Sequence, residues 1–192
     1  MTDRRSFSHA IAEGDGISVI ASVDDPAGAR SAEEQRAEAL LVRADPRAIR
    51  EASSLPILWR AEAPLDDTVE HADAVLIAFD DEGHFEELHA RAVALGLDCA
   101  VEVGNEEDLE QVLERIDPEI FLLSPSDGDD DETPLELVLD LLAAVPAGKL
   151  AIADLPVVTP RETLELEQAG CDAVIATSRN IEALAGDLPP DV

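Results

Sequence analysis

The segment CAVEVGNEEDLEQVLERIDPEIFLLS, residues 99–124, contains the repeating unit from which the chain is built. Cys99–Val103 and Ile120–Ser124 are short apolar runs, which are typical of strands buried on both faces of a parallel sheet. Between them, Glu106–Ile116 carries apolar residues at three-to-four-residue spacing, and this spacing predicts an amphipathic helix. The segment therefore predicts a strand, a crossover helix and a second strand parallel to the first.

Eight apolar runs of this kind are spaced along the chain, and helical stretches separate the later ones. The runs are Ile17–Ser22, Ala39–Arg43, Pro56–Arg60, Ala74–Phe79, Cys99–Val103, Ile120–Ser124, Leu150–Ala153 and Ala173–Thr177. The helical stretches are Gly83–Leu95, Glu106–Ile116, Thr133–Ala144 and Thr159–Ala169. Eight strand-helix repeats predict an α/β fold of the (β/α)8, or TIM, barrel type.

The first half of the chain offers less helix than the second. Its connections near Ala32–Ala37, Arg47–Ser53 and Leu65–His71 allow only one or two helical turns each. At 192 residues the chain is also just below the ~200 residues usual for such barrels. We therefore expect a trimmed barrel with reduced helices in its first half. An open doubly wound sheet is the competing fold, and the lack of a Gly-rich loop after any strand argues against it.

A single domain is expected over residues 1–192, with residues 1–16 as an N-terminal extension and residues 186–192 as a flexible tail. The first residues include two arginines but no apolar segment after them. No apolar run approaches the ~20 residues that span a bilayer. These features predict a cytoplasmic protein.

Acidic residues outnumber basic ones 44 to 13, which gives a formal net charge of -31. This charge excludes the nucleic-acid backbone as a general partner and disfavours anionic membranes. It also destabilises a compact state by self-repulsion unless salt screens it. The acid excess, the single lysine and the 3% of aromatic residues together indicate adaptation to high salt.

The residue types that most often bind metals are few and scattered. Cys99 and Cys171 lie in or beside apolar runs and are expected to be buried thiols. His84 and His89 are five residues apart, which is a poor spacing for one helical face. We therefore expect no metal site and no cofactor. The acidic loop at residues 127–131 is expected to be solvated and mobile.

Short motifs follow one another along nearly the full length of the chain in a characteristic order and spacing. They are Arg5–Ala12 with Ile17–Ala21, Pro56–Leu58, Ala72–Ile77, Leu95–Val103 with Asn105–Leu109, Ala153–Asp154, and Glu165–Ala173. Together they resemble the indole-3-glycerol phosphate synthase family, and the chain looks like a diverged, shortened member. The resemblance implies a TIM barrel in which a short N-terminal helix precedes the first strand.

The resemblance also implies a reaction of tryptophan biosynthesis. The family closes an indole ring, because an anilino sugar phosphate cyclises with loss of carbon dioxide and water. This chemistry requires a general acid, a general base, and cations that bind a carboxylate and a phosphate. Family lysines on the first and third strands and a glutamate on the fifth strand supply much of it.

The family's catalytic positions are largely substituted in this chain. The first-strand glutamate and lysine fall on Ser22 and Asp24, and the third-strand lysine falls on Arg60, which holds its proton too firmly to be a good general acid. Lys149, the sole lysine, precedes the seventh strand at the opposite end of the barrel. The fifth-strand glutamate is kept as Glu102. The resemblance thus implies Glu102 as a base and Arg60 as an electrostatic clamp, and the alternative is a structural ion pair between them.

The family's substrate- and phosphate-binding positions fall on the last three units. In this chain the resemblance places them at Ser124, Asp154, Thr177, Ser178 and Arg179. Pro156 replaces a family glycine whose backbone N–H faces the phosphate, so one donor is lost. The alternative at residues 177–179 is an ordinary strand-to-helix turn in which Ser178 caps the helix.

Three functions remain open on the sequence. The first is related chemistry on a sugar phosphate by a protein impaired by the loss of both lysines. The second is a paralogue that has lost catalysis and binds a small anion or a tryptophan-pathway protein. The third is an unrelated small-molecule activity, because a fold does not fix a function. Asp24, Asp25 and Asp154 would share one metal ion in a further alternative, against which we favour plain solvation of the three carboxylates.

Overall fold

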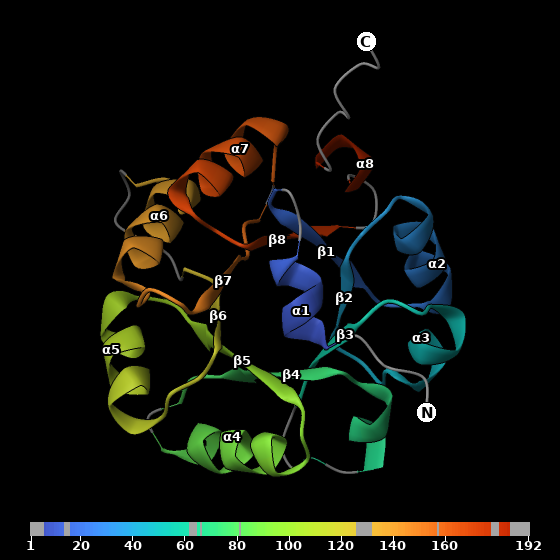
Figure 1. The fold of residues 1–192 in the computed structure, drawn as a ribbon, viewed down its shortest axis with the longest axis horizontal. Helices are drawn as coiled ribbons and strands as arrows, with labels where there is room; N and C mark the ends of the chain where they lie inside the picture. The colour runs from blue at the N-terminus through green and yellow to red at the C-terminus, as the bar shows by residue number, and fades with distance from the viewer. Residues whose placement is uncertain are drawn as a thin grey trace.

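Eight parallel strands close into a barrel in the order in which they occur along the chain (Figure 1). A computed structural model describes residues 6–13, 16–61, 65, 67–80, 82–125, 132–156, 158–177 and 181–184. The first strand pairs with the second on one side and with the eighth on the other, so the sheet has no free edge. The predicted (β/α)8 barrel is confirmed, and the open-sheet alternative is excluded.

The elements match the predicted runs to within one or two residues in most units. The strands are β1 (Ser18–Val23), β2 (Ala39–Val42), β3 (Ile57–Arg60), β4 (Ala74–Ala78), β5 (Asp98–Val103), β6 (Ile120–Leu123), β7 (Leu150–Ala153) and β8 (Ala173–Thr177). The helices are α1 (Phe7–Ala12), α2 (Pro26–Glu34), α3 (Arg47–Ala52), the 3-10 turn η1 (Asp67–His71), α4 (His84–Ala94), α5 (Glu106–Arg115), α6 (Pro134–Ala144), α7 (Pro160–Ala169) and α8 (Ile181–Leu184). Helices α2, α3 and η1 have 9, 6 and 5 residues, against 10 or 11 for α4 to α7, so the first part of the chain carries less helix, as predicted, although α2 is longer than the one or two turns expected.

Helix α2 begins earlier than its predicted place near Ala32–Ala37. The Asp25 side chain accepts a hydrogen bond from the backbone N–H of Gly28 at 2.7 Å, and a proline occupies the first turn. Aspartate is a preferred N-cap and proline is favoured at the first helical position, so the helix begins directly after Asp25. The capping threonines of α6 and α7 show the same local chemistry.

Helix α1 closes one end of the barrel. Phe7 is 0% and Ile11 is 2% exposed, and both pack into the interior core of the barrel. The backbone N–H of Ser8 donates to the carboxylate of Asp98, at the start of β5, at 2.8 Å. Figure 1 shows α1 in the middle of the ring of strands. Among the described residues, α1 therefore fills the end of the barrel at which the strands begin.

Side chains along each strand alternate between the barrel interior and the layer beneath the helices, because successive residues of a strand point to opposite faces. The interior core holds, from the strands, Ile20, Ala39, Leu41, Leu58, Ala74, Leu76, Ala100, Ile120, Leu122, Ile152, Ala173 and Ile175. The outer core holds the alternate residues, among them the lone tryptophan, Trp59. This alternation decides which residues reach the open end.

Three carboxylates near the starts of the strands make the same pair of backbone contacts. In each case the residue just before an even-numbered strand donates its N–H to the facing residue of the preceding strand, and its carboxylate accepts that residue's N–H. These pairs are Glu38 with Val19, Asp73 with Ile57, and Asp172 with Ala151, with hydrogen bonds of 2.8 to 3.0 Å. The contacts tie strands β1 and β2, β3 and β4, and β7 and β8 together in register.

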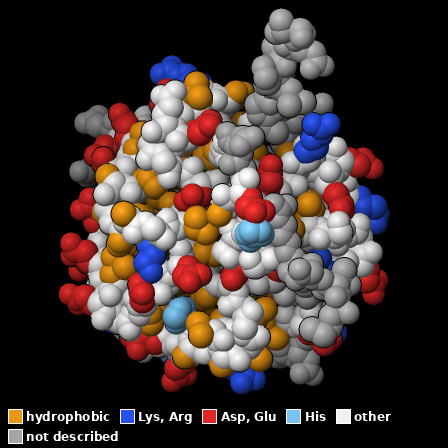
Figure 2. All heavy atoms as spheres, in the orientation of Figure 1, with side chains coloured by type: hydrophobic (Ala, Val, Ile, Leu, Met, Phe, Trp, Pro, Cys, Tyr) orange, Lys and Arg blue, Asp and Glu red, His pale blue; other side chains and the backbone are white. Residues whose placement is uncertain are grey.

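The surface reflects the acidic composition of the chain. Acidic side chains are spread around the face shown in Figure 2, with a few basic ones between them. Cys99 and Cys171 are buried free thiols, as predicted. Among the described residues no helix is both long enough and apolar enough to cross a membrane.

Candidate functional site

The open end of the barrel is ringed by the residues that come next on the inward face of each strand. Each lies two positions beyond the last interior core residue of its strand, so the alternation of the strands turns it toward the mouth. These eight mouth positions are Ser22, Arg43, Arg60, Ala78, Glu102, Ser124, Asp154 and Thr177. Five of them were predicted as site residues, and the shared rule explains why they converge.

Arg60 and Glu102 form an ion pair across the mouth. The Nη2 atom of Arg60 lies 2.8 Å from Oε2 of Glu102, and Nη1 donates to Oε1 at 3.3 Å. The side chain of Arg60 is 34% exposed and that of Glu102 is 17% exposed. Among the described residues, Oε2 of Glu102 is buried and accepts no well-aligned hydrogen bond. The two predicted catalytic residues are thus brought together, in the ion pair that the alternative interpretation describes.

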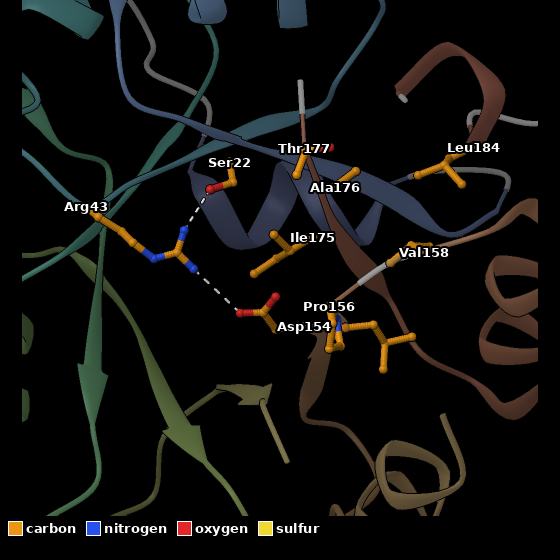
Figure 3. Close-up of a pocket in the computed structure, with 10 residues that line it drawn as sticks. Ser22, Arg43, Asp154, Pro156, Val158, Ile175, Ala176, Thr177 and Leu184 are labelled. Carbon is orange, nitrogen blue, oxygen red and sulfur yellow. Dashed lines mark hydrogen bonds and ion pairs between the residues drawn. The ribbon is translucent and has the colours of Figure 1, made fainter. Parts of the chain in front are cut away.

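Arg43 is a mouth residue that the sequence interpretation missed. Its Nη1 atom donates to Oγ of Ser22 at 2.7 Å, and its Nη2 atom lies 3.6 Å from Oδ2 of Asp154. Figure 3 shows its guanidinium between these two side chains. The signal was present in the sequence, because Arg43 follows the last interior residue of its strand, Leu41, by two positions, as Arg60 does on β3.

Asp154 is a largely buried carboxyl of the mouth, with its side chain 22% exposed. Burial raises the pKa of its carboxyl, and the nearby negative charge of Glu102 adds to this effect, while Arg43 and Arg60 act to lower the pKa. Asp154 therefore lies within electrostatic range of the other three charged side chains of the mouth. At the eight mouth positions two guanidinium groups and two carboxylates balance to zero formal charge, in a chain whose net charge is -31.

A pocket of about 380 Å³ opens beside Arg43, at the ends of β1, β7 and β8 (Figure 3). Its polar side consists of Ser22, Arg43, Asp154 and Thr177. Its apolar side consists of Leu155, Pro156, Val158, Ile175, Ala176 and Leu184. Its volume falls in the ~300–1,000 Å³ range of small-molecule sites.

Some of the predicted phosphate-binding residues lie among the residues that the structure describes, and others do not. Thr177 and Asp154 line the pocket. Ser124 is a mouth residue on the next strand, and its backbone N–H donates to the carbonyl of Val103 at 3.0 Å. Ser178 and Arg179 lie outside the described residues, as do the acidic loop at 127–131 and the C-terminal tail, so the predictions about them stay predictions.

The alternative of a metal ion shared by Asp24, Asp25 and Asp154 has no support in the geometry. Asp25 caps α2 through its carboxylate, and Asp154 faces Arg43. Within the part of the chain that the structure describes, no three or more His, Cys, Asp or Glu side chains gather where they could bind a metal ion.

The fold and the mouth define a (β/α)8 barrel with a pocket of mixed charge at the carboxyl ends of its strands. Solved barrels share this architecture. N-acetylmannosamine-6-phosphate 2-epimerase from Clostridium perfringens matches with a TM-score of 0.69 and 14% identity over 88% of each chain. Thiamine phosphate pyrophosphorylase from Pyrococcus furiosus matches with a TM-score of 0.63 and 16% identity, over 87% of this chain and 88% of the other. These likenesses establish the fold alone.

Sequence similarity relates the chain to one group of barrel proteins. The indole-3-glycerol phosphate synthase of Lachnospira eligens is 31% identical over 148 residues, which are 70% of this chain and 54% of the relative. Those of Geobacillus kaustophilus (28% over 137 residues; 67% and 53% of the two chains) and Salinibacter ruber (34% over 107 residues; 54% and 39%) are also similar. The matches thus span about half of these relatives or less, and no family model matches. The chain is a diverged relative of the indole-3-glycerol phosphate synthases, as its motifs predicted.

Proposed function

We propose that this protein binds a small organic anion at the mouth of the barrel and does not carry out the indole ring closure of its relatives. The observation that carries the proposal is that the cations of the mouth are arginines, Arg43 and Arg60, each facing a carboxylate. Guanidinium groups bind carboxylate and phosphate through planar pairs of hydrogen bonds, but they do not give up a proton near neutral pH.

The position of the sole lysine supports the loss of ring closure. Lys149 precedes β7, at the end of the barrel that α1 fills, and its Nζ atom lies 2.6 Å from Oδ1 of Asp117. It therefore cannot supply the proton that the family's lysines are expected to donate at the mouth. Since water must leave during ring closure, the absence of a lysine donor removes general-acid assistance of the kind worth about 10²–10⁴-fold in rate.

The pocket beside Arg43 supports the binding of an organic anion. It places one guanidinium next to apolar side chains, which suits a ligand with one charged end and a carbon body. The relatives are named for a phosphate ester, and this is consistent with an anionic ligand.

A second function, residual acid–base chemistry on such a ligand, is favoured by one observation. The mouth holds two carboxyl groups in different surroundings, because Glu102 is paired directly with Arg60 while burial raises the pKa of Asp154. Carboxyl groups in unlike surroundings are suited to act as base and acid in one reaction. In this candidate function Glu102 is the base, Arg60 is the clamp and Asp154 is the acid.

The first experiment measures binding of inorganic phosphate, acetate and glycerol phosphate by calorimetry. Arg43→Ala and Arg60→Ala are expected to weaken binding by about tenfold or more, because each removes a charge-assisted contact. Arg161→Ala is the matched control, since Arg161 is 87% exposed on α7 and pairs only with Glu165 among the described residues. Binding that is unchanged in both mouth variants would show that the anion site lies elsewhere.

The second experiment is a single-turnover assay with the family's anilino sugar phosphate. We expect no indole product from the protein, and no difference between it and Glu102→Gln. Product that disappears in Glu102→Gln would instead establish the acid–base function and overturn the proposed loss of ring closure.

A further inference from the structure

Arg43 has two partners of unequal strength. Its contact with Ser22 is a normal hydrogen bond at 2.7 Å, whereas its contact with Asp154 is a long ion pair at 3.6 Å. Its side chain is 41% exposed, so a ligand in the pocket can reach the guanidinium. The hydrogen bond to Ser22 holds the guanidinium of Arg43 in place. Asp154 lies on the Nη2 side of this guanidinium, where a more strongly bound anion would have to replace it.

The pocket favours a ligand with one charge and an apolar body. Pro156 has no backbone N–H to offer, and Leu155, Val158 and Leu184 present hydrocarbon where a phosphate group would need several donors. Among the described side chains that line the pocket, Arg43 is the one that carries a positive charge. A carboxylate can be satisfied by one guanidinium fork, so it fits this lining better than a doubly charged phosphate does.

Binding of such an anion to Arg43 changes the electrostatic surroundings of Asp154. The charged groups that face it are Arg43 at the end of β2, Arg60 at the end of β3 and Glu102 at the end of β5. Burial already raises the pKa of Asp154, and Arg43 is the strongest influence that lowers it. When the carboxylate of a ligand pairs with Arg43, Asp154 loses the positive charge of its partner. The negative charge of the ligand then lies close to Asp154, and both changes favour the protonated form of Asp154.

We propose that the pocket binds a small monocarboxylate with an apolar body, whose carboxylate replaces Asp154 as the partner of Arg43 while Asp154 takes up one proton from solvent. This inference rests on the proposed anion-binding function and adds to it the class of the ligand and a coupled proton. Asp154 thus acts as an internal competitor that keeps the guanidinium paired in the absence of a ligand.

The test is calorimetric titration with hexanoate at several pH values between about 8 and 5.5, in two buffers that differ in ionisation enthalpy. We expect affinity to rise as the pH falls, with uptake of about one proton per hexanoate bound. Hexanesulfonate, which stays ionised throughout, checks that the proton goes to the protein and not to the probe. Asp154→Asn is expected to bind hexanoate roughly three- to tenfold more tightly near pH 8 and to lose both the proton uptake and the pH dependence.

Two further variants test the proposal even if Asp154→Asn fails to fold. Ser22→Ala frees Arg43 from its anchor and is expected to weaken the binding of hexanoate and acetate alike. Val158→Ala removes part of the apolar side and is expected to weaken hexanoate several-fold but not acetate. Arg161→Ala again controls for the loss of a charge.

The outcomes separate the two proposals. If anions bind at the mouth without proton uptake, or if phosphate binds more tightly than hexanoate, the inference about ligand class and competition is wrong and the proposed function stands. If neither phosphate nor any carboxylate binds, the proposed function itself is wrong.

Discussion

Arg60 on β3 forms an ion pair with Glu102 on β5, across the end of the intervening strand β4. The two residues end β3 and β5, and the Nη2 to Oε2 distance is 2.8 Å. The mouth position of the intervening strand β4 is Ala78, whose methyl group leaves room for the guanidinium. The pair therefore links two non-adjacent strands, and its loss should be felt in the stability of the barrel as well as in ligand binding.

We expect Arg60→Ala to lower the free energy of unfolding by about 1–3 kcal/mol, because it leaves a mostly buried carboxylate without its counter-charge. The double variant Arg60→Ala with Glu102→Gln should recover part of this loss, since it removes the stranded charge as well. Urea unfolding followed by the fluorescence of Trp59 measures both. A double variant no more stable than Arg60→Ala would show that the carboxylate is well solvated without the arginine.

Asp172 gives a prediction for the pH dependence of stability. Burial raises the pKa of its carboxyl, so between this raised value and the ordinary value of 3.8 the folded protein binds more proton than the unfolded chain. The contribution of Asp172 to stability therefore increases as the pH falls through that window. Asp172→Asn keeps an oxygen that can accept the N–H of Ala151 but carries no charge.

The variant Asp172→Asn should be at least as stable as the natural sequence near pH 7, and its advantage should shrink as the pH falls toward 4. Comparing the two proteins cancels the titration of the other acidic residues. An advantage that grows at low pH, or a constant deficit, would contradict the assigned direction of the pKa shift.

The two cysteines predict very slow thiol chemistry in the folded state. Burial raises the pKa of Cys99 and of Cys171 to about 12, so at pH 8 only about one thiol in ten thousand is ionised. We expect a disulfide reagent to modify both cysteines at a rate set by unfolding, and to modify them at once in denaturant. Fast modification of one cysteine in native conditions would reveal a local opening of the structure around it.

High salt should stabilise the protein, because it screens the repulsion among the residues that give a net charge of -31. We expect Tm to rise between low and molar potassium chloride, with roughly 2–4 °C for each kcal/mol of relieved repulsion. Sucrose is the control, since it favours the folded state without screening charge. Equal shifts in salt and sucrose would remove charge repulsion as the cause, and with it the predicted adaptation to high salt.

Much of the barrel could be predicted from the sequence because its strands are continuous apolar runs and most of its helices carry capping signals. The predicted stretches Thr133–Ala144 and Thr159–Ala169 coincide with α6 and α7, whereas the helix predicted near Ala32–Ala37 begins earlier, at Pro26, because Asp25 caps it. The rule that places Arg60 and Glu102 at the mouth could have placed Arg43 as well.

The partners within the mouth were less accessible to sequence reasoning. The approach of Arg43 to Asp154 joins β2 to β7, strands that are far apart in the chain and meet only because the ring closes. The charge state of Asp154 depends on how deeply the neighbouring side chains bury it. Neither the pairing of Arg43 with Asp154 nor the burial of Asp154 follows from the local sequence.

The paired backbone contacts of Glu38, Asp73 and Asp172 have a consequence for how the ring assembles. A slip of one residue between two of these strands would set a carboxylate against a carbonyl oxygen, and two like partial charges would then meet away from water. At three of the eight strand pairs of the barrel, these contacts therefore disfavour pairing in a shifted register. In a chain that otherwise repels itself, these few acidic groups help to select one arrangement of strands over its shifted alternatives.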